Sequence, residues 1–303
     1  MIQSIYSVLV NWNLKDHTLT CVQSLVDAGA SVDHVIVVDN GSTDGSSEAL
    51  RQSFGKDLHL IINDENLGFA EGSNLAIRHA LTQGAEWVFI LNNDTIVAPT
   101  VFDELASASA ENEEYVILSP LILYHDEPDR IWHLGGKLIP GTLITRSLYK
   151  GHMDLGNLPP LVPVDFVSGS GMLVRREVFE TIGLFDTAYF MYGEEVDFCW
   201  RARSAGYRLA CAPRAKMWHK VSASASRDPD TTRYLKIRNQ IRFYQRYANP
   251  PQRLIMLAFT LARSLVLAFR DLLKGQPDLI VPLFEGWADG WFRPGIPARQ
   301  YRQ

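Results

Sequence analysis

The stretch VIVVDNGSTDGSSEALRQSF, residues 35–54, holds in one segment the pattern that decides the fold. Its β-branched run, Val35–Asp39, is typical of a buried strand. A turn rich in Asp, Asn, Gly and Ser follows, and then a helix is predicted over Ser46–Phe54, with Ser46 or Ser47 as its N-cap. A strand that leads through a polar loop into a helix is the first half of a βαβ unit.

The same alternation extends in both directions from this stretch. Strands are predicted at Ile5–Val10, Val35–Asp39, Leu58–Asn63 and Trp87–Leu91, and helices at Lys15–Ala28, Ser46–Phe54 and Phe69–Gln83. Further on we predict a helix at Pro99–Glu113, a strand at Val116–Leu123, an excursion without regular structure at Asp126–Pro163, and strand and helix order again over Val164–Gly206. This repetition predicts an α/β fold with a mostly parallel sheet flanked by helices.

Length, charge and cysteine content exclude several classes of protein. The 303 residues suffice for one large domain or two modest ones, without need of a disulfide. The formal net charge of −5 argues against a dedicated nucleic-acid-binding protein. The three cysteines (Cys21, Cys199 and Cys211) lack metal-ligand spacing, which favours buried, inert thiols in a reduced compartment. Because the N-terminus shows no signal-peptide pattern, we expect a cytoplasmic protein.

A shift in composition near residue 225 is the one candidate domain boundary. From Thr231 to Arg270 there is no acidic residue, whereas eight basic residues occur. We therefore predict an α/β domain over residues 1–225. Residues 226–303 are predicted to form a helical C-terminal extension.

The predicted extension combines basic and apolar features. Arg238, Arg242 and Arg246 are spaced four apart and predict one basic stripe on a helix, with Tyr234, Phe243, Tyr244 and Tyr247 nearby. The apolar run Leu254–Leu273 contains Arg263 and Arg270, which disfavours a membrane-spanning helix. Two interpretations remain open: a helix lying on an anionic membrane surface, or a helix packed as a core or dimer contact. A further alternative is that some of these arginines face an anionic ligand such as a diphosphate.

Four polar clusters stand where predicted strands end: Asn11–Asn13, Asp39–Asp44, Asn66–Phe69 and Asn92–Asp94. None has the spacing of a P-loop, a dinucleotide-binding glycine motif or an EF-hand. Each taken alone is an ordinary turn, but ligands of parallel sheets bind beyond the carboxyl ends of the strands. A carboxylate there can accept hydrogen bonds from a nucleobase or ribose, and a second can hold a divalent cation against a diphosphate.

Seven segments, in this order and spacing, resemble inverting family 2 glycosyltransferases with the GT-A fold. In the first half they are VLVNWN (8–13), VVDNGSTDGS (37–46), NLGFAEGSN (66–74) and LNNDT (91–95). In the second half they are SGSGMLVRREVFETIGLFD (168–186), FMYGEEVDFCWRARSAGYRL (190–209) and WHK (218–220). The likeness is strongest to bacterial rhamnosyltransferase-like members that build surface polysaccharides.

The resemblance implies a nucleotide-binding half at residues 1–95, an acceptor and catalytic half at 96–225, and particular roles on the donor side. The carboxylate that contacts the nucleotide base would be Asp39, and the element that binds ribose and metal would be Asn92-Asn93-Asp94. The remaining implied donor-binding residues are Asn11, Asn66, Gly68 and Gly171. The first Asp of the family's metal-binding element is replaced by Asn92, a neutral and weaker ligand, so Asp94 would carry most of the coordination.

The resemblance also implies a metal ligand and a catalytic base. His219 would join Asp94 in holding Mn²⁺ or Mg²⁺, and the cation would neutralise charge on the departing diphosphate. Glu195 would accept the proton of the attacking hydroxyl; the family has Asp there, and Glu194 is the neighbouring alternative. Asp197 is instead predicted to pair with Arg201 four residues on.

The expected function is therefore transfer of a sugar from a nucleotide donor to a hydroxyl of a saccharide or lipid-linked saccharide. The preferred donor is dTDP-rhamnose, which supplies L-rhamnose, and a UDP-sugar is the second choice. The expected partners are that donor and that acceptor, and no nucleic acid. The extension would contact either the cytoplasmic face of an anionic membrane or a second copy of the chain in a homodimer. Two alternatives stay open, a sugar-phosphate nucleotidylyltransferase and a non-catalytic nucleotide-sugar-binding module. The first would need a Gly- and Arg-rich loop after Val10, where the chain has only Asn11-Trp12-Asn13.

Overall fold

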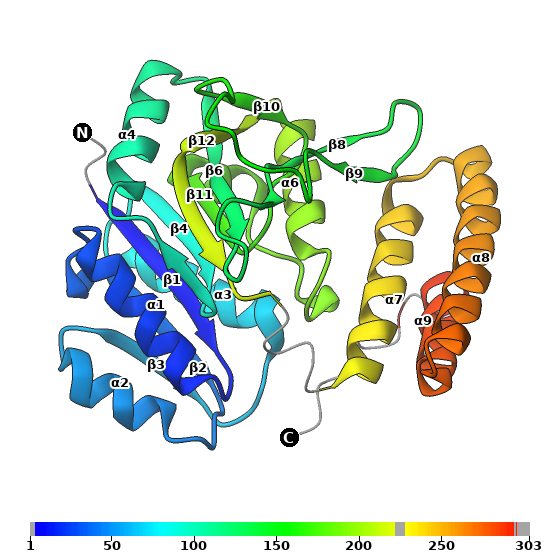
Figure 1. The fold of residues 1–303 in the computed structure, drawn as a ribbon, viewed down its shortest axis with the longest axis horizontal. Helices are drawn as coiled ribbons and strands as arrows, with labels where there is room; N and C mark the ends of the chain where they lie inside the picture. Colours follow the sequence, from blue (N-terminus) through cyan, green and yellow to red (C-terminus); the bar gives the residue numbers. More distant parts are fainter. Residues whose placement is uncertain (1–3, 222–227, 294, 296–303) are drawn as a thin grey trace.

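A computed structural model describes residues 4–221, 228–293 and 295 of the chain. Within these residues, ten strands form one sheet with helices on both faces, and three further helices stand to one side (Figure 1). The strand order is β10-β12-β6-β11-β4-β1-β2-β3, with β5 paired to β12 and β7 to β6. The predicted α/β class is confirmed.

The first part of the chain builds the parallel half of the sheet. Its elements are β1 (Ile5–Asn11), α1 (Lys15–Asp27), β2 (Val35–Asn40), α2 (Ser46–Phe54), β3 (His59–Asn63), α3 (Gly68–Thr82) and β4 (Trp87–Asn92), with a short 3-10 turn, η1 (Val32–His34), before β2. Asn11 of β1 is in register with Asp39 of β2, and Val10 with Asn92 of β4. The polar residues that end these strands therefore meet at one edge of the sheet.

The second part adds a mixed half to the same sheet. Its elements are β5 (Thr95–Val97), α4 (Val101–Glu111), β6 (Tyr115–Tyr124), β11 (Gly171–Arg175), α5 (Arg176–Ile182), η2 (Thr187–Tyr189), α6 (Glu194–Ser204) and β12 (Arg208–His219). β11 lies antiparallel between β4 and β6, whereas β12 runs parallel to β6. β12 brings His219 opposite Thr95.

The sequence predicted no regular structure for Asp126–Pro163, and this prediction was wrong. It contains β7 (Ile131–His133), β8 (Gly136–Leu138), β9 (Thr145–Ser147) and the start of β10 (Val162–Val164). β8 and β9 pair as a separate small sheet, while β7 and β10 join the main sheet at β6 and β12. Three-residue strands carry too little periodic signal to be recognised in a sequence.

The predicted N-cap of α2 was wrong. Gly45, in the left-handed region at φ 80°, occupies the N-cap, and Ser46 is the first helical residue. Asp44 accepts the hydrogen bond from the Ser46 backbone N–H at 3.1 Å, as capping side chains do. The Ser47 hydroxyl is directed instead to the Asp39 carboxylate.

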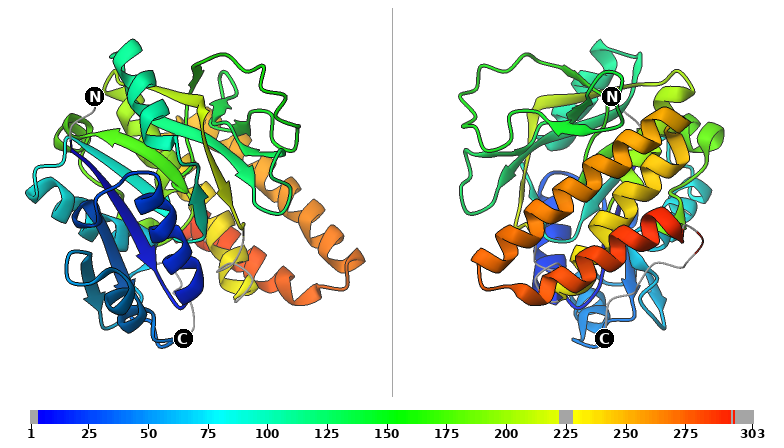
Figure 2. Two further views of the ribbon diagram at one scale, coloured as in Figure 1. Left: turned by 60° about the vertical axis from the view of Figure 1, so that its left-hand side comes forward. Right: turned by 90° about the vertical axis from the view of Figure 1, so that its right-hand side faces the viewer.

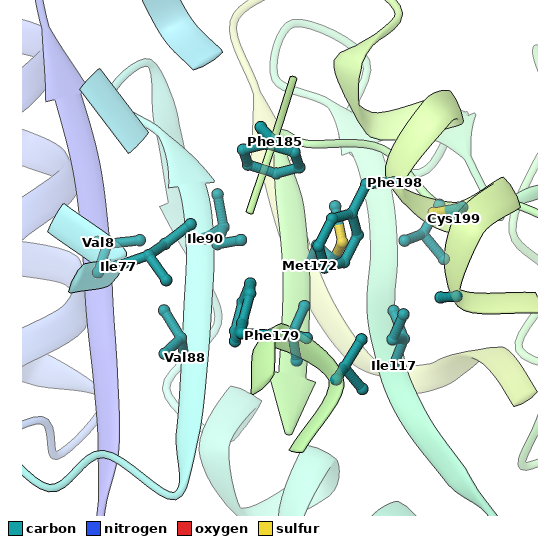
Figure 3. Packing of buried hydrophobic residues seen from close by; sticks show 14 of the residues in the cluster. Val8, Ile77, Val88, Ile90, Ile117, Met172, Phe179, Phe185, Phe198 and Cys199 are labelled. Atoms are coloured by element: carbon teal, nitrogen blue, oxygen red, sulfur yellow. The ribbon is translucent and has the colours of Figure 1, made fainter. Parts of the chain in front are cut away.

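Alternating strand residues divide the core into two layers, one on each face of the sheet. Val8, Ile90 and Met172 come from neighbouring strands and pack on one face with aromatic rings from the helices (Figure 3). Leu9 and Phe89 pack on the other face, as a two-residue side-chain period requires. The three cysteines are buried and free, as predicted, and burial raises the pKa of Cys21 and Cys199 to about 12.

The C-terminal helices are α7 (Pro229–Tyr247), α8 (Pro250–Leu273) and α9 (Ile280–Phe292), with a 3-10 turn, η3 (Pro277–Leu279), between the last two. α7 lies between the α/β domain and α8, and α8 and α9 form the outer face (Figures 1 and 2). The predicted boundary at residue 225 lies outside the described residues. The predicted split at residue 95 falls within one continuous sheet, in which β4 pairs with β11.

The basic stripe predicted on α7 is present, and of the two interpretations left open, packing holds for this helix. Arg238 is buried and donates to the Ala188 carbonyl oxygen at 3.1 Å, and Arg246 lies 2.7 Å from the Asp186 carboxylate. Arg242 also lies against Asp186, at 3.5 Å. Tyr234, Phe243 and Tyr244 are buried as well. The spacing did place the arginines on one side of the helix, but that side faces the α/β domain rather than a membrane.

α7 and α9 approach closely at two glycines. A Cβ atom added at Gly286 would lie 2.5 Å from the Tyr234 carbonyl oxygen, and one at Gly290 would lie 2.8 Å from the Ile241 Cβ. Only glycine allows this approach without a shift of the α7 backbone.

We predict that Gly286→Ala destabilises the protein by about 1–3 kcal/mol, because the methyl group overpacks the contact between α7 and α9. Urea unfolding followed by circular dichroism measures this change. At an uncrowded helical position the same substitution would stabilise by up to about 1 kcal/mol, so the sign of the change separates crowding from helix propensity. A stabilised variant would contradict the packing.

Candidate active site

A pocket of about 300 Å³ opens at the carboxyl ends of the parallel strands. Such an edge is where ligands bind in open α/β sheets. Of the residues predicted from the sequence, those lining it are Asn66, Gly68, Asn92, Asn93, Asp94, Glu194, Glu195 and His219. Asn11, Asp39 and Gly171 do not line it. The pocket thus joins residues from both halves of the α/β domain.

Asp94 and His219 form one wall of the pocket, and both side chains are buried. The Asp94 Oδ1 and His219 Nε2 atoms are 3.0 Å apart, and the Trp132 ring packs edge-on against the His219 ring at 4.5 Å between centroids. Burial alone would raise the pKa of Asp94, but the hydrogen bond and the charge of His219 hold it below its ordinary value. Asp94 is therefore an anion in this wall.

The donor atoms of this wall suit a divalent cation. Two ligand atoms that each lie ~2.1 Å from an ion, at right angles, are ~3.0 Å apart, which matches the separation of Asp94 Oδ1 and His219 Nε2. The Asn92 side-chain amide lies 3.4 Å from the same His219 atom. Among the described residues no group of three or more His, Cys, Asp or Glu side chains forms a metal cluster. A cation bound here would need further oxygens from a ligand or water.

Asn11 and Asp39 lie behind the pocket in a buried hydrogen-bonded network. Asn11 Nδ2 donates to Asp39 Oδ1 at 3.4 Å and to the Ser42 hydroxyl at 3.0 Å. Asn93, which does line the pocket, donates to Asn11 Oδ1 at 3.1 Å. The network fixes the loops after β1, β2 and β4 relative to one another. The contact between Asp39 and a nucleobase stays a prediction.

Gly171 belongs to the packing of the sheet. It is buried at the start of β11, and a Cβ there would lie 2.5 Å from the Met217 sulfur. Its neighbours Ser168, Gly169 and Ser170 line the pocket instead. The glycine-rich turn therefore reaches the cavity through the three residues directly before Gly171.

Glu194 and Glu195 begin α6 on another wall of the pocket. Burial raises the pKa of both carboxyl groups, and the negative charge of Glu195 raises that of Glu194 further. Glu195 Oε2 accepts a hydrogen bond from the Gly193 backbone N–H at 2.9 Å, which orients its carboxyl group. For the buried Glu194 Oε2, no hydrogen-bond partner is found within the described part of the chain. A carboxyl group with a raised pKa in a pocket suits proton transfer.

The backbone that leads into these two acids is strained. Phe190, Tyr192 and Gly193 all have positive φ angles, of 64°, 71° and 95°. The Phe190 carbonyl oxygen accepts a hydrogen bond from the Ala70 N–H at 3.1 Å, next to the tight approach at Gly68. Left-handed non-glycine residues persist only where their surroundings hold them, and they gather at functional sites.

Asn239 of α7 holds this strained segment. Its side-chain amide is buried and lies 2.8 Å from each of the carbonyl oxygens of Tyr189, Met191 and Tyr192. Its Oδ1 accepts from Arg238 at 2.7 Å. The C-terminal extension therefore positions the loop that presents Glu194 and Glu195, although it lies outside the sheet.

Asp197, two residues beyond Glu195, joins α6 to α7. The predicted pair with Arg201 is present at 2.8 Å. The same buried carboxylate also lies 3.2 Å from Arg246 and accepts from the Tyr247 hydroxyl at 2.8 Å. Its structural role is thus larger than the helix-surface pair that was expected.

Sequence reasoning missed Lys236, Tyr192 and Trp12 among the residues that line the pocket. Lys236 comes from α7, and its ammonium lies 4.8 Å from the centroid of the Tyr192 ring. Burial and the nearby charge of Arg233 lower the pKa of Lys236. The basic run after residue 231 was the available signal, and the residue that reaches the pocket is a lysine rather than one of the arginines.

The sheet, the carboxylate and imidazole at its edge, and the acids of α6 define a GT-A-type enzyme. The sequence model for glycosyl transferase family 2 matches residues 8–183, more than half of the chain. The protein belongs to glycosyl transferase family 2.

Several characterised proteins are similar to this chain. An N-acetylglucosaminyl-diphospho-decaprenol L-rhamnosyltransferase from Mycobacterium tuberculosis is 31% identical, over 64% of this chain and 69% of its own. The dTDP-rhamnosyl transferase RfbF of Shigella flexneri is 26% identical, over 73% and 70%. The galactofuranosyltransferase GlfT1 of Mycolicibacterium smegmatis is 24% identical, over 77% and 80%.

A solved structure confirms the GT-A likeness of the fold. The mannosyltransferase PcManGT from Pyrobaculum calidifontis, in complex with GDP-Man and Mn²⁺, superimposes with a TM-score of 0.55. The match covers 95% of this chain and 87% of the mannosyltransferase at 17% identity. Its wide coverage includes the C-terminal helices as well as the sheet.

We predict that Asn239→Asp lowers turnover by about 10²-fold, because a misplacement of ~1 Å of the acids has an effect of that size. The change keeps the shape of the side chain. It replaces the amide NH₂ group, which donates to the three carbonyl oxygens, with a carboxylate oxygen, which cannot donate. Donor turnover, thermal unfolding and nucleotide affinity are measured together. The matched control is Asn157→Asp at an exposed loop position, which should behave as wild type. Unchanged turnover in the Asn239 variant would refute the positioning role.

Proposed function

We propose that this enzyme transfers a sugar, with inversion at the anomeric carbon, from a nucleoside diphosphate donor to a hydroxyl of a saccharide or lipid-linked saccharide in cell-surface glycan synthesis. L-Rhamnose from dTDP-rhamnose is the proposed donor sugar. The names of the mycobacterial and Shigella relatives support this choice, and that of the mycobacterial one supports a lipid-linked acceptor. A galactofuranosyl donor is the alternative, and the name of the relative GlfT1 supports it.

One observation carries the proposal: Asp94 and His219 on one wall, and Glu194 and Glu195 on another, line the same pocket. The pair on the first wall suits the binding of a cation that would also contact a diphosphate. The two glutamates on the other wall suit removal of a proton from the attacking hydroxyl. Lys236 adds a positive charge from α7 that favours an anionic ligand. A sugar held between the two walls would have its leaving group on one side and its attacking hydroxyl on the other.

The proposed chemistry needs one proton transfer. The acceptor oxygen forms a bond to the anomeric carbon while the bond from that carbon to the diphosphate oxygen breaks. Glu195 takes the proton of the attacking hydroxyl, and the diphosphate leaves as an anion without protonation. Asp94 and His219 would hold Mn²⁺ or Mg²⁺, and a bound cation would neutralise the charge that develops on the diphosphate.

Donor binding provides the first test. We expect dTDP to bind about tenfold or more tightly when Mn²⁺ is present, a change of about 1.4 kcal/mol or more, because a bound cation would neutralise charge on the diphosphate. Asp94→Asn should remove this enhancement while the fold persists. Titration calorimetry measures both, and Asp103→Asn on the exposed face of α4 is the matched control. If UDP binds and dTDP does not, the proposed donor is wrong; if no nucleotide binds, the proposed function fails.

The catalytic base provides the second test. We expect Glu195→Gln to lower turnover by about 10²–10⁴-fold while leaving donor affinity nearly unchanged. Because burial raises the pKa of this carboxyl above its ordinary value of 4.5, the rate should rise with pH through a limb above pH 4.5, where the base loses its proton. Because the charge of Glu195 raises the pKa of Glu194 further, Glu194 is still neutral where Glu195 loses its proton, so Glu194→Gln should leave that limb in place.

Steady-state rates for dTDP-rhamnose turnover across a pH series check these expectations. Near-normal turnover in Glu195→Gln together with a large loss in Glu194→Gln would move the base to Glu194. No turnover of any nucleotide sugar by a wild-type protein that binds nucleotides would favour a non-catalytic binding module.

A further inference from the structure

α8 has an inverted distribution of polarity. Its buried line, which packs toward α7 and α9, includes Thr260, Ser264 and Asp271. The indole N–H groups of Trp287 and Trp291 donate to the Thr260 hydroxyl at 3.1 and 2.9 Å. Small and polar side chains thus face the protein on this helix, which is the reverse of a helix that covers a soluble domain.

The exposed side of α8 is apolar over its whole length. Its large exposed side chains are Leu254, Ile255, Leu261, Leu265, Val266, Phe269, Leu272 and Leu273. Val266 and Phe269 expose 68% and 64% of their surface. α8 forms the outer layer of this flank, as the right-hand view in Figure 2 shows. A continuous apolar face of this kind marks an interaction surface.

Basic residues accompany this face. The exposed charged side chains of α8 are Arg253, Arg263 and Arg270, with Lys274 directly after the helix, whereas its one acidic residue, Asp271, is buried and lies 2.9 Å from Arg233. A contact between two copies about a two-fold axis would bring the same basic helix against itself. An anionic surface instead complements both the charge and the apolar face.

We infer that the outer face of α8 lies on an anionic membrane surface, with the helix in the plane of the interface. Its apolar side chains would enter the boundary between headgroups and acyl chains, and its arginines would reach the phosphates. The helix is long and apolar enough to cross a membrane by length and composition, with 22% of its apolar window buried. A crossing would place Arg263 near the middle of the bilayer and separate the Thr260 hydroxyl from its two indole partners.

This placement brings the pocket close to the lipid surface. α7 packs against α8 and also supplies Lys236 to the pocket, so one helix layer separates the two. Packed helices lie ~8–10 Å apart. A saccharide carried on a lipid at the cytoplasmic face of the membrane would therefore be within reach. The membrane surface is inferred independently of which sugar is transferred.

Vesicle flotation of the full chain tests the inference. We expect about tenfold tighter binding to vesicles of phosphatidylcholine mixed with phosphatidylglycerol than to phosphatidylcholine alone, with a loss of the difference at high salt. Val266→Asp with Phe269→Asp should abolish flotation, and both sites are exposed enough to leave the fold intact. The matched control is Leu155→Asp, which replaces a leucine that is 76% exposed on the α/β domain.

Three outcomes would overturn the inference. The wild-type protein does not float with anionic vesicles; the double variant floats as well as wild type; or the protein resists extraction by salt and alkaline carbonate, as a spanning helix does. A dimer in sedimentation that the double variant dissociates, without flotation, would assign the face to a second copy. Donor turnover without vesicles is measured in parallel, so failure of this inference and failure of the proposed function are distinguishable.

Discussion

The three contacts from the Asn239 amide to the backbone of residues 189–192 are the constraint on which the arrangement of the site depends. The segment they hold contains two non-glycine residues with positive φ angles, a conformation that costs about 1–3 kcal/mol at each residue. Without a partner the loop would relax, and the acids that begin α6 would move with it. The catalytic wall of the pocket is therefore built jointly by the α/β domain and α7.

α7 also neutralises a buried negative charge. Asp197 is fully buried two residues beyond Glu195, and a lone buried carboxylate would be costly. Arg201 of its own helix and Arg246 of α7 neutralise it, and Tyr247 donates a hydrogen bond. The arginines of α7 that resemble a membrane-binding stripe in the sequence thus bind the domain to its extension. The surface that we propose for a membrane is the next helix, α8, whose Thr260 and Asp271 side chains have partners inside the protein.

The opposite walls of the pocket reach their properties by different routes. Asp94 stays ionised because an imidazole lies beside it, whereas burial raises the pKa of both Glu194 and Glu195, and the charge of Glu195 raises that of Glu194 further. The first environment favours a permanent anion that attracts cations. The second favours a group that keeps its proton to a higher pH than an exposed carboxyl group does. Two sets of carboxylates can therefore do separate work within one cavity.

The sequence by itself determined the βαβ half of the sheet and the polar edge of its strands, and most of the site residues predicted from it line the pocket. The strands and their polar edge follow from local periodicity and from the geometry of parallel sheets, in which strand ends meet, whereas Glu194, Glu195 and His219 came from the resemblance to family 2 glycosyltransferases. Only the tertiary structure decided that Asn239 and Lys236 belong to the site, that Asp39 and Gly171 stand behind it, and that the arginines of α7 face inward. Helical periodicity shows which side chains share a face, but what that face meets depends on packing between segments far apart in the chain.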